Sequence, residues 1–329
     1  MKSVLSRVKI ALFAAPLLSL AAASGAYAAE DWPKKQPIRI ISPYAPGGTT
    51  DVMARLLGQR LQAKLGQSVI VENRAGAGGN IGTDVVAKAD ADGYTLLLAA
   101  SGPLVIAPSL YPKLPYQPLK DFTYITPVAN AAFVVVSNVN SGLNTLKDVM
   151  TQGKQDGKLA FASAGSGTPQ HIIGELFNIQ AGTKILHIPY KGSGPAMNDL
   201  VGGQVPMAIE NPVVAMPHVK SGKLKVLAVT GAKRSVALPD VPTVAELGLT
   251  GFDARPWYGL LGPNGMPAEV TAKLNMAVGE ILSNPEIKQR IESLGAEPMH
   301  MSSKEFTEFV AQDLKKWTGV VKTSGATVD

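Results

Sequence analysis

The chain has 329 residues, with 31 Lys and Arg against 25 Asp and Glu, and it contains no cysteine. The lack of cysteine excludes disulfides, thiolate metal sites and a cysteine nucleophile. The formal charge of +6 is not concentrated in any run of Lys and Arg, so we expect no nucleic-acid partner. A chain of this length predicts two domains.

The N-terminus has the pattern of a cleavable signal peptide. Lys2, Arg7 and Lys9 precede an almost wholly apolar stretch at 10–23, and a small-x-small site follows at 26–28. The apolar stretch is shorter than the about 20 residues that a membrane-spanning helix needs. We therefore expect cleavage after Ala28 and a soluble periplasmic protein, without a lipid anchor, whose formal charge falls to +3 because the leader carries three cations and no anion.

The first third of the mature chain alternates between strands and helices. Apolar runs predict strands at 38–41, 68–72 and 94–99. A helical spacing of apolar residues follows the first strand from Asp51 and ends at Gly66, and a Gly-rich loop at 75–79 leads into a second helix. Strands alternating with single helices predict βαβ units and a largely parallel sheet.

The same alternation starts again after Pro127. It predicts five strands and two clear helices, namely strands 133–137, 159–163, 185–189, 205–210 and 224–230 and helices 146–155 and 169–181. A last strand at 258–261 precedes a helical C-terminus that opens with a capping box from Ser302 to Glu305. Its apolar face should belong to the core, and consists of Phe306, Phe309, Val310 and Trp317. We expect one lobe from 29–128 and 250–329 and a second lobe from 129–249.

Two loops share one design, and each follows a strand and opens a helix. They span residues 46–51 and 163–169 and combine glycines with the hydroxyls of Thr49, Ser163 and Thr168. The first N–H groups of a helix lack internal partners, and together with the helix dipole they form an anion site without a full positive charge. The alternative is that these residues only cap their helices and make the turns.

Motifs of common enzymes fail on inspection. The stretch 76–82 resembles a dinucleotide fingerprint, but its third glycine is one place late and no acidic residue ends the next strand. It is better explained as a tight turn. The four histidines are too scattered for a local metal pair, and no nucleophile–base pair can be proposed. His171, near the second loop, fits a ligand donor as well as a helix-packing residue. We expect no metal, no cofactor and no enzymatic activity.

At these loops the chain resembles a known family, the Bug receptors, which are the substrate-binding proteins of tripartite tricarboxylate transporters. The resemblance covers nearly the whole mature chain and is carried by ordered motifs, of which the longest are Tyr44-Ala45-Pro46-Gly47-Gly48-x-x-Asp51, Val71-Glu72-Asn73-Arg74-x-Gly76-x-Gly78-Gly79 and Ala162-Ser163-x-Gly165-x-Gly167-Thr168-x-x-His171. It implies an α/β, two-lobed periplasmic-binding-protein fold of the Venus-flytrap, type II-like kind. In this fold mostly parallel sheets are flanked by helices, and the ligand lies between the lobes.

The resemblance also implies the residues that line the cleft. From the first lobe these are Tyr44, Gly48, Thr49, Asp51 and Ser101. From the second lobe they are Ser163, Ala164, Gly167, Thr168 and His171, with Tyr190 and Asn211 on neighbouring strand ends. Asp51 is equally explained by the dipole of its own helix. Arg255 stands where small polar residues are more usual, and it either reaches the cleft to pair with a second carboxylate or points to solvent.

The function implied is that of a monomeric periplasmic receptor. It would capture a small organic acid as its carboxylate and deliver it to the permease subunits of a tripartite transporter. The sequence leaves open a ligand-sensing receptor that docks on a signalling kinase, and less favoured is an enzyme acting on carboxylic esters or amides. Citrate-like, C4-dicarboxylate and aromatic acids, and neutral amides or vitamins, all remain as ligands.

Overall fold

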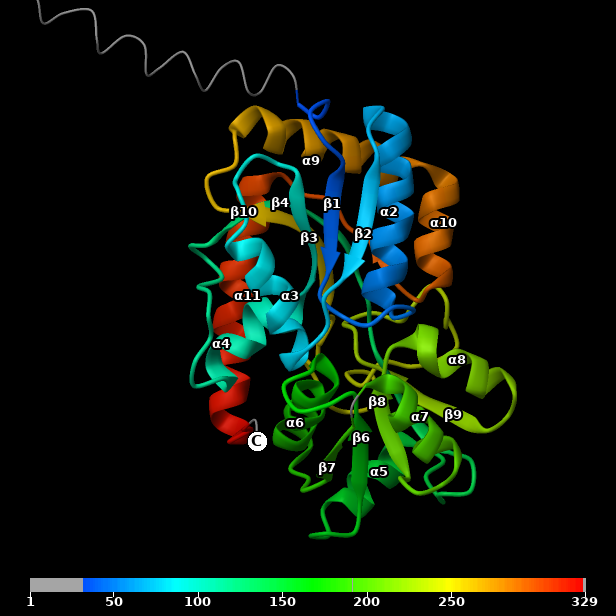
Figure 1. The fold of residues 1–329 in the computed structure, drawn as a ribbon. Coiled ribbons are helices and arrows are strands. Elements are labelled where there is room, and N and C mark those ends of the chain that lie inside the picture. The colour runs from blue at the N-terminus through cyan, green and yellow to red at the C-terminus, as the bar shows by residue number, and fades with distance from the viewer. Residues whose placement is uncertain (1–31, 191, 328–329) are drawn as a thin grey trace, which may run out of the picture.

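The computed structural model describes residues 32–190 and 192–327, so the predicted signal peptide at 1–28 lies outside the described residues. Two sheets, each flanked by helices, stand one above the other in Figure 1. We call the part built on the six-stranded sheet the first lobe and the part built on the five-stranded sheet the second lobe. Within the described residues, no helix is both long enough and apolar enough to cross a membrane.

The first lobe holds a sheet with the strand order β11-β4-β10-β3-β1-β2. Its strands are β1 (Ile38–Ser42), β2 (Val69–Asn73), β3 (Thr95–Ala100), β4 (Phe122–Asn130), β10 (Trp257–Pro263) and β11 (Glu297–Pro298). β1 pairs in parallel with β2 and β3, whereas β10 lies antiparallel between β3 and β4. The strand that returns from the second lobe is therefore inserted, reversed, into the sheet.

The second lobe repeats this arrangement with the order β7-β6-β8-β5-β9. Its strands are β5 (Val134–Asn138), β6 (Ala160–Ser163), β7 (Leu186–Pro189), β8 (Met207–Glu210) and β9 (Leu224–Val229). β6 pairs in parallel with β7 and β8, and β5 is antiparallel to β8 and β9. The reversed strand here is β5, the first strand that the chain forms after it leaves the first lobe. Both sheets are α/β units with helices on both faces, as predicted.

Helices cover both faces of each sheet because the strands bury side chains on both sides. In the first lobe they are α2 (Thr49–Leu65), α3 (Asn80–Ala87), α4 (Ala107–Leu110), α9 (Ala268–Ser283), α10 (Pro285–Ser293) and α11 (Ser303–Ser324), with the short segments η1 (Ala77–Gly79) and η2 (Gly102–Ile106). In the second lobe they are α5 (Leu146–Gly153), α6 (Pro169–Ala181), α7 (Ser193–Val201) and α8 (Pro212–Lys220). Gly66 ends α2 in the left-handed conformation, and Ser302 opens α11 with the predicted capping box.

The sequence pattern did not reveal strand β4, which runs through Pro127. A proline has no N–H to donate, so it is unfavourable inside a sheet except at an edge or a bulge. The pairing of β4 with β10 shifts register between Gly259, which lies opposite Pro127, and Tyr258, which lies opposite Ala129. The irregularity accommodates the proline and lets the strand continue to the crossing between lobes.

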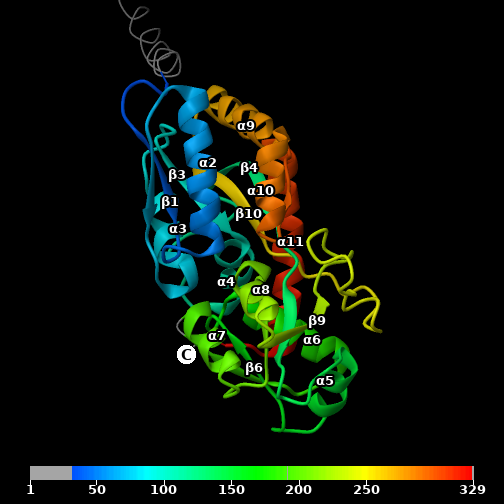
Figure 2. The ribbon, with the colours of Figure 1, turned by 90° about the vertical axis from the view of Figure 1, so that its right-hand side faces the viewer.

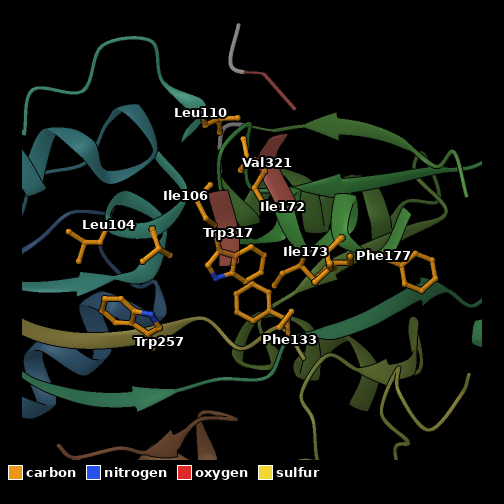
Figure 3. Close-up of a cluster of buried hydrophobic side chains, with 14 of the residues drawn as sticks. Leu104, Ile106, Leu110, Phe133, Ile172, Ile173, Phe177, Trp257, Trp317 and Val321 are labelled. Carbon is orange, nitrogen blue, oxygen red and sulfur yellow. The ribbon is translucent and has the colours of Figure 1, made fainter. Parts of the chain in front are cut away.

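The hydrophobic core is continuous between the lobes. α11 packs against β4 and η2 in the first lobe, and it also packs against α6 in the second lobe (Figure 2). Figure 3 shows Trp317 and Val321 of α11 together with Ile106 of η2 and Ile172 of α6. The proposed lobe boundaries at residues 128 and 250 stay a prediction; β4 ends at Asn130 and β5 begins at Val134.

Candidate functional site

The loop between β1 and α2 is held by Asp51. Its carboxylate accepts hydrogen bonds from Gly47 N at 2.9 Å, Asn73 Nδ2 at 2.9 Å and Arg55 Nε at 3.1 Å. Burial alone would raise the pKa of Asp51, but the hydrogen bonds from Arg55, Gly47 and Asn73 outweigh it and lower that pKa. The carboxylate is therefore ionised, and its hydrogen bonds are made to residues of the loop and its neighbours. Gly47 adopts a φ of +85° to close the turn.

The other first-lobe candidates lie around this loop. Tyr44 donates from its hydroxyl to Gly78 O at 3.1 Å. Thr49, the first residue of α2, is buried, and its side chain lies beside the Tyr258 hydroxyl. Ser101 follows β3 directly and is buried, at the point where η2 begins. A Cβ placed on Gly102 would lie 3.5 Å from Cδ of Pro169 in α6, so the two lobes are in close contact here.

The second loop, between β6 and α6, is held by its own side chains. Ser163 Oγ accepts from Gly165 N at 3.0 Å and lies 2.6 Å from Nε2 of His187. Gly167 N donates to Nδ1 of His171 at 3.1 Å, and Thr168 Oγ1 donates to Gly165 O at 2.7 Å. The Ala164 carbonyl accepts from Gly192 N at 3.0 Å. Most polar groups of this loop are thus engaged inside the second lobe.

The helices that follow the two loops have no side-chain caps. α2 begins after Gly48, and α6 begins after Thr168, whose hydroxyl is turned to Gly165 instead of capping the helix. α3, α7 and α9 also lack a side-chain cap, whereas α5, α8, α10 and α11 are capped by Thr145, Asn211, Asn284 and Ser302. The first-turn N–H groups of α2 and α6 therefore have no side-chain acceptor, although the sequence offered suitable capping residues.

A tyrosine that the sequence analysis did not select joins the two half-sites. Tyr258, on β10, is buried, and Asn211 of the second lobe lies with Nδ2 3.3 Å from its hydroxyl. The Thr49 side chain of the first lobe lies beside the same hydroxyl, and burial raises the pKa of Tyr258 to about 12. Tyr258 begins the predicted strand 258–261, and no local pattern distinguishes it, so only the fold brings it beside the candidate residues.

A second residue that the sequence analysis passed over is Glu210, at the carboxyl end of β8. It is 1% exposed and accepts hydrogen bonds from Gln170 Nε2 at 3.1 Å and Asn211 N at 2.7 Å. Burial raises the pKa of Glu210, and the hydrogen bonds from Asn211 N, Ser193 and Gln170 only partly offset this. A buried acid thus lies beside the start of α6, at the second loop that the sequence predicts as an anion site.

Two candidates are engaged elsewhere. Tyr190 donates from its hydroxyl to Asp199 Oδ2 of α7 at 2.8 Å. Arg255 forms a two-bond ion pair with Asp253, at 2.8 Å and 2.9 Å, in the segment that returns to the first lobe. Among the residues that the structure describes, no group of three or more His, Asp or Glu side chains is placed to hold a metal ion.

Comparison with known proteins identifies the family of the chain. The family model described as "Tripartite tricarboxylate transporter family receptor" matches residues 53–326. The protein BugT of Bordetella pertussis is 42% identical over 300 residues, which are 91% of this chain and 92% of BugT. The family and the solved relatives are substrate-binding proteins rather than enzymes.

Two solved relatives contain ligands. An R. palustris protein solved with adipate has a TM-score of 0.85 at 32% identity, over 91% of this chain and 100% of its own. MatC from Rhodopseudomonas palustris, solved with malate, has a TM-score of 0.80 at 32% identity, over 88% of this chain and 99% of its own. The fold is therefore that of a two-lobed periplasmic binding protein, and the chain belongs to the tripartite tricarboxylate transporter receptor family, among the Bug proteins.

Proposed function

We propose that the protein captures a small organic carboxylate between its two lobes. The observation that carries this proposal is the pair of uncapped helix starts, one per lobe, at α2 and α6. Backbone N–H groups and helix dipoles bind an anion without a full positive charge. The two relatives solved with adipate and with malate support a dicarboxylate as ligand.

Closure of the lobes would make the site selective. Thr49 and Asn211 come from different lobes and both contact the Tyr258 hydroxyl, so this contact belongs to the closed arrangement. A ligand that touches both lobes has a higher affinity for the closed form and shifts the population toward it. The closed form would then be the one that a permease recognises.

The proposed place of action is the periplasm, and the proposed partner is the permease of a tripartite transporter. The predicted leader at 1–28 and the family both support this. Deleting the gene should abolish uptake of the bound acid, and a permease deletion should have the same effect. Uptake that survives both deletions would contradict delivery to such a permease.

The first test is a thermal-shift screen of ligand-stripped mature protein, beginning at residue 29. The panel contains adipate, malate, citrate, benzoate and their neutral amides. A ligand at 100 times its Kd adds about 2.7 kcal/mol to the free energy of unfolding, which raises the melting temperature by several degrees. A shift with an acid and none with its amide supports the proposal. No shift with any acid, from protein shown to be empty, would contradict it.

Gly48→Val tests the first helix start directly. Gly48 has an ordinary φ of −76°, and a Cβ there would have only Ala45 O, at 3.8 Å, as a neighbour. The fold should therefore tolerate valine, while its methyl groups block the approach of an anion to the first turn of α2. We expect at least a tenfold loss of affinity by calorimetric titration, which is roughly 1.4 kcal/mol of binding free energy. The melting temperature should not change. Gly319→Val on the exposed face of α11 is the control and should bind normally.

A further inference from the structure

Two histidines lie stacked behind the second loop. The rings of His171, in the first turn of α6, and His187, on β7, have centroids 3.9 Å apart and an interplanar angle of 10°. Phe161 of β6 lies next to His187, with ring centroids 5.1 Å apart. The His171 ring is only 4% exposed, so its polar nitrogens need partners inside the protein.

Each ring holds one end of the loop. His187 contacts the Ser163 hydroxyl through Nε2 at 2.6 Å, and this hydroxyl accepts from Gly165 N. His171 accepts from Gly167 N through Nδ1 at 3.1 Å. Because that N–H points at Nδ1, the neutral His171 ring must have its own proton on Nε2. This nitrogen lies 4.0 Å from Glu175 Oε1.

Both rings are neutral under ordinary conditions. Burial lowers the pKa of His171 to about 4, and burial together with the neighbouring His171 lowers the pKa of His187 to about 3. The hydrogen bonds require a neutral His171 ring, because a proton on Nδ1 would point at the N–H of Gly167, and neither group could then accept. The other charged groups of the surrounding cavity, Lys184 and Asp156, pair with each other at 3.0 Å.

The rings are reached from the side of the second lobe. A cavity of about 480 Å³ is lined by His171, His187, Glu175 and Ser166, and by the C-terminal residues 324–327. No first-lobe residue of the proposed carboxylate site lines this cavity. The stacked pair thus supports the loop from behind, away from the helix starts that face the first lobe.

We propose that His171 and His187 are positioning residues of the ligand site: the stacked pair fixes the loop at Ser163 and Gly167, and the first-turn N–H groups of α6 are left for the ligand. This inference rests on the proposed function, in which the anion binds at that helix start. It also changes the expected roles of Ser163, Gly167 and His171 from direct ligand contacts to supports of the loop.

Matched variants separate a positioning role from simple packing. His187→Gln places an amide nitrogen near the position of Nε2 and can keep the contact with Ser163, and His171→Asn places an oxygen near Nδ1 and can keep the contact with Gly167. His187→Leu and His171→Leu fill similar space but cannot form either hydrogen bond. His218→Leu, on α8, is the control for replacing a histidine in the second lobe.

The experiment has two readouts. Affinity for the acid found in the screen should fall about tenfold in each leucine variant, as expected for one lost hydrogen bond, and should stay within about threefold in the amide variants. Amide resonances of Gly165 and Gly167 in ¹⁵N-labelled, ligand-free protein should move in the leucine variants and return toward wild type in the amide variants. Equal affinities and unmoved resonances in all variants would overturn the inference.

The amide resonances keep this test separate from the proposed function. If no acid binds wild-type protein, the proposed function fails while the resonances still report whether the pair holds the loop. If the leucine variants do not fold, Ser163→Ala removes the same hydroxyl contact without touching the rings. It should shift the Gly165 resonance and weaken binding, because the Ser163 hydroxyl accepts from Gly165 N and contacts His187. A Ser163→Ala protein with wild-type affinity and an unmoved Gly165 resonance would overturn the inference.

Discussion

At the scale of single residues, hydrogen bonding decides which polar groups of the two loops a ligand can use. Asp51 is occupied by Gly47, Asn73 and Arg55, and it serves as the brace of its loop. The Thr168 hydroxyl is turned to Gly165, and the α6 helix start is left uncapped. The side chains that look most like ligand contacts in the sequence, those of Asp51 and Thr168, already form hydrogen bonds within the protein. The backbone N–H groups at the starts of α2 and α6 have no side-chain cap.

Glu210→Gln tests the buried acid beside the site. Burial raises the pKa of Glu210 above its usual 4.5, so its ionised form is less favourable in the folded than in the unfolded state. This destabilisation is absent below pH 4.5 and grows as the pH rises through the folded-state pKa. Glutamine keeps an oxygen for Gln170 and Asn211 without the charge.

We therefore expect Glu210→Gln to raise the melting temperature at pH 7.5 and to leave it nearly unchanged at pH 4. Thermal unfolding at both pH values measures this. Exposed Glu308→Gln is the control, and it should change stability by less than about 0.5 kcal/mol at either pH. A Glu210→Gln protein that is less stable than wild type at pH 7.5 would show that the carboxylate is needed where it is.

At the scale of elements, glycines set how closely helices approach strands. A Cβ on Gly174 of α6 would overlap the ring of Phe161 in β6, and one on Gly259 of β10 would lie 2.5 Å from Cζ of Phe306 in α11. These glycines let bulky buried rings fill the space between layers. Periodicity located the elements, but it carries no information on this distance between them.

Replacing two helical glycines by alanine should change the stability of the protein in opposite directions. Alanine improves helix propensity by about 1 kcal/mol at either position. Gly174→Ala should nevertheless destabilise the protein, since overpacking against Phe161 costs roughly 1–3 kcal/mol. Gly319→Ala, on α11 with nothing within 4 Å of its Cβ, should stabilise it. Melting temperatures measure both, and a stabilising Gly174→Ala would mean that Phe161 has room to move.

At the scale of the whole molecule, α11 connects the two lobes. Its first turns pack Phe306 against Tyr124 and Trp257 in the first lobe, with ring centroids 5.3 Å and 5.2 Å apart. Its later turns place Trp317 in the cluster that includes Ile172 of the second lobe. Trp257 also donates to Asp313 of α11 at 2.8 Å. One buried cluster therefore spans both lobes, besides the clusters that lie within each lobe.

We expect this shared core to make the lobes unfold together. Differential scanning calorimetry of the mature, ligand-free protein should give one transition with equal calorimetric and van't Hoff enthalpies. Trp317→Ala should lower its temperature, since removing a buried tryptophan costs about 3–5 kcal/mol, and should do so for both lobes at once. Two separate transitions in wild-type protein would show that the lobes are independent.

The sequence by itself determined the alternation of strands and helices, the end of α2 at Gly66, the capping box of α11, the helix starts that follow the two loops, and the family. These features depend on periodicity and on residues within a few positions of one another. Only the tertiary structure decided that β4 continues through Pro127, that His187 contacts Ser163, that Tyr258 joins Thr49 to Asn211, and that α11 bridges the lobes. Each of these joins residues far apart in the chain, and local pattern cannot specify such contacts because they arise only when separate elements pack together.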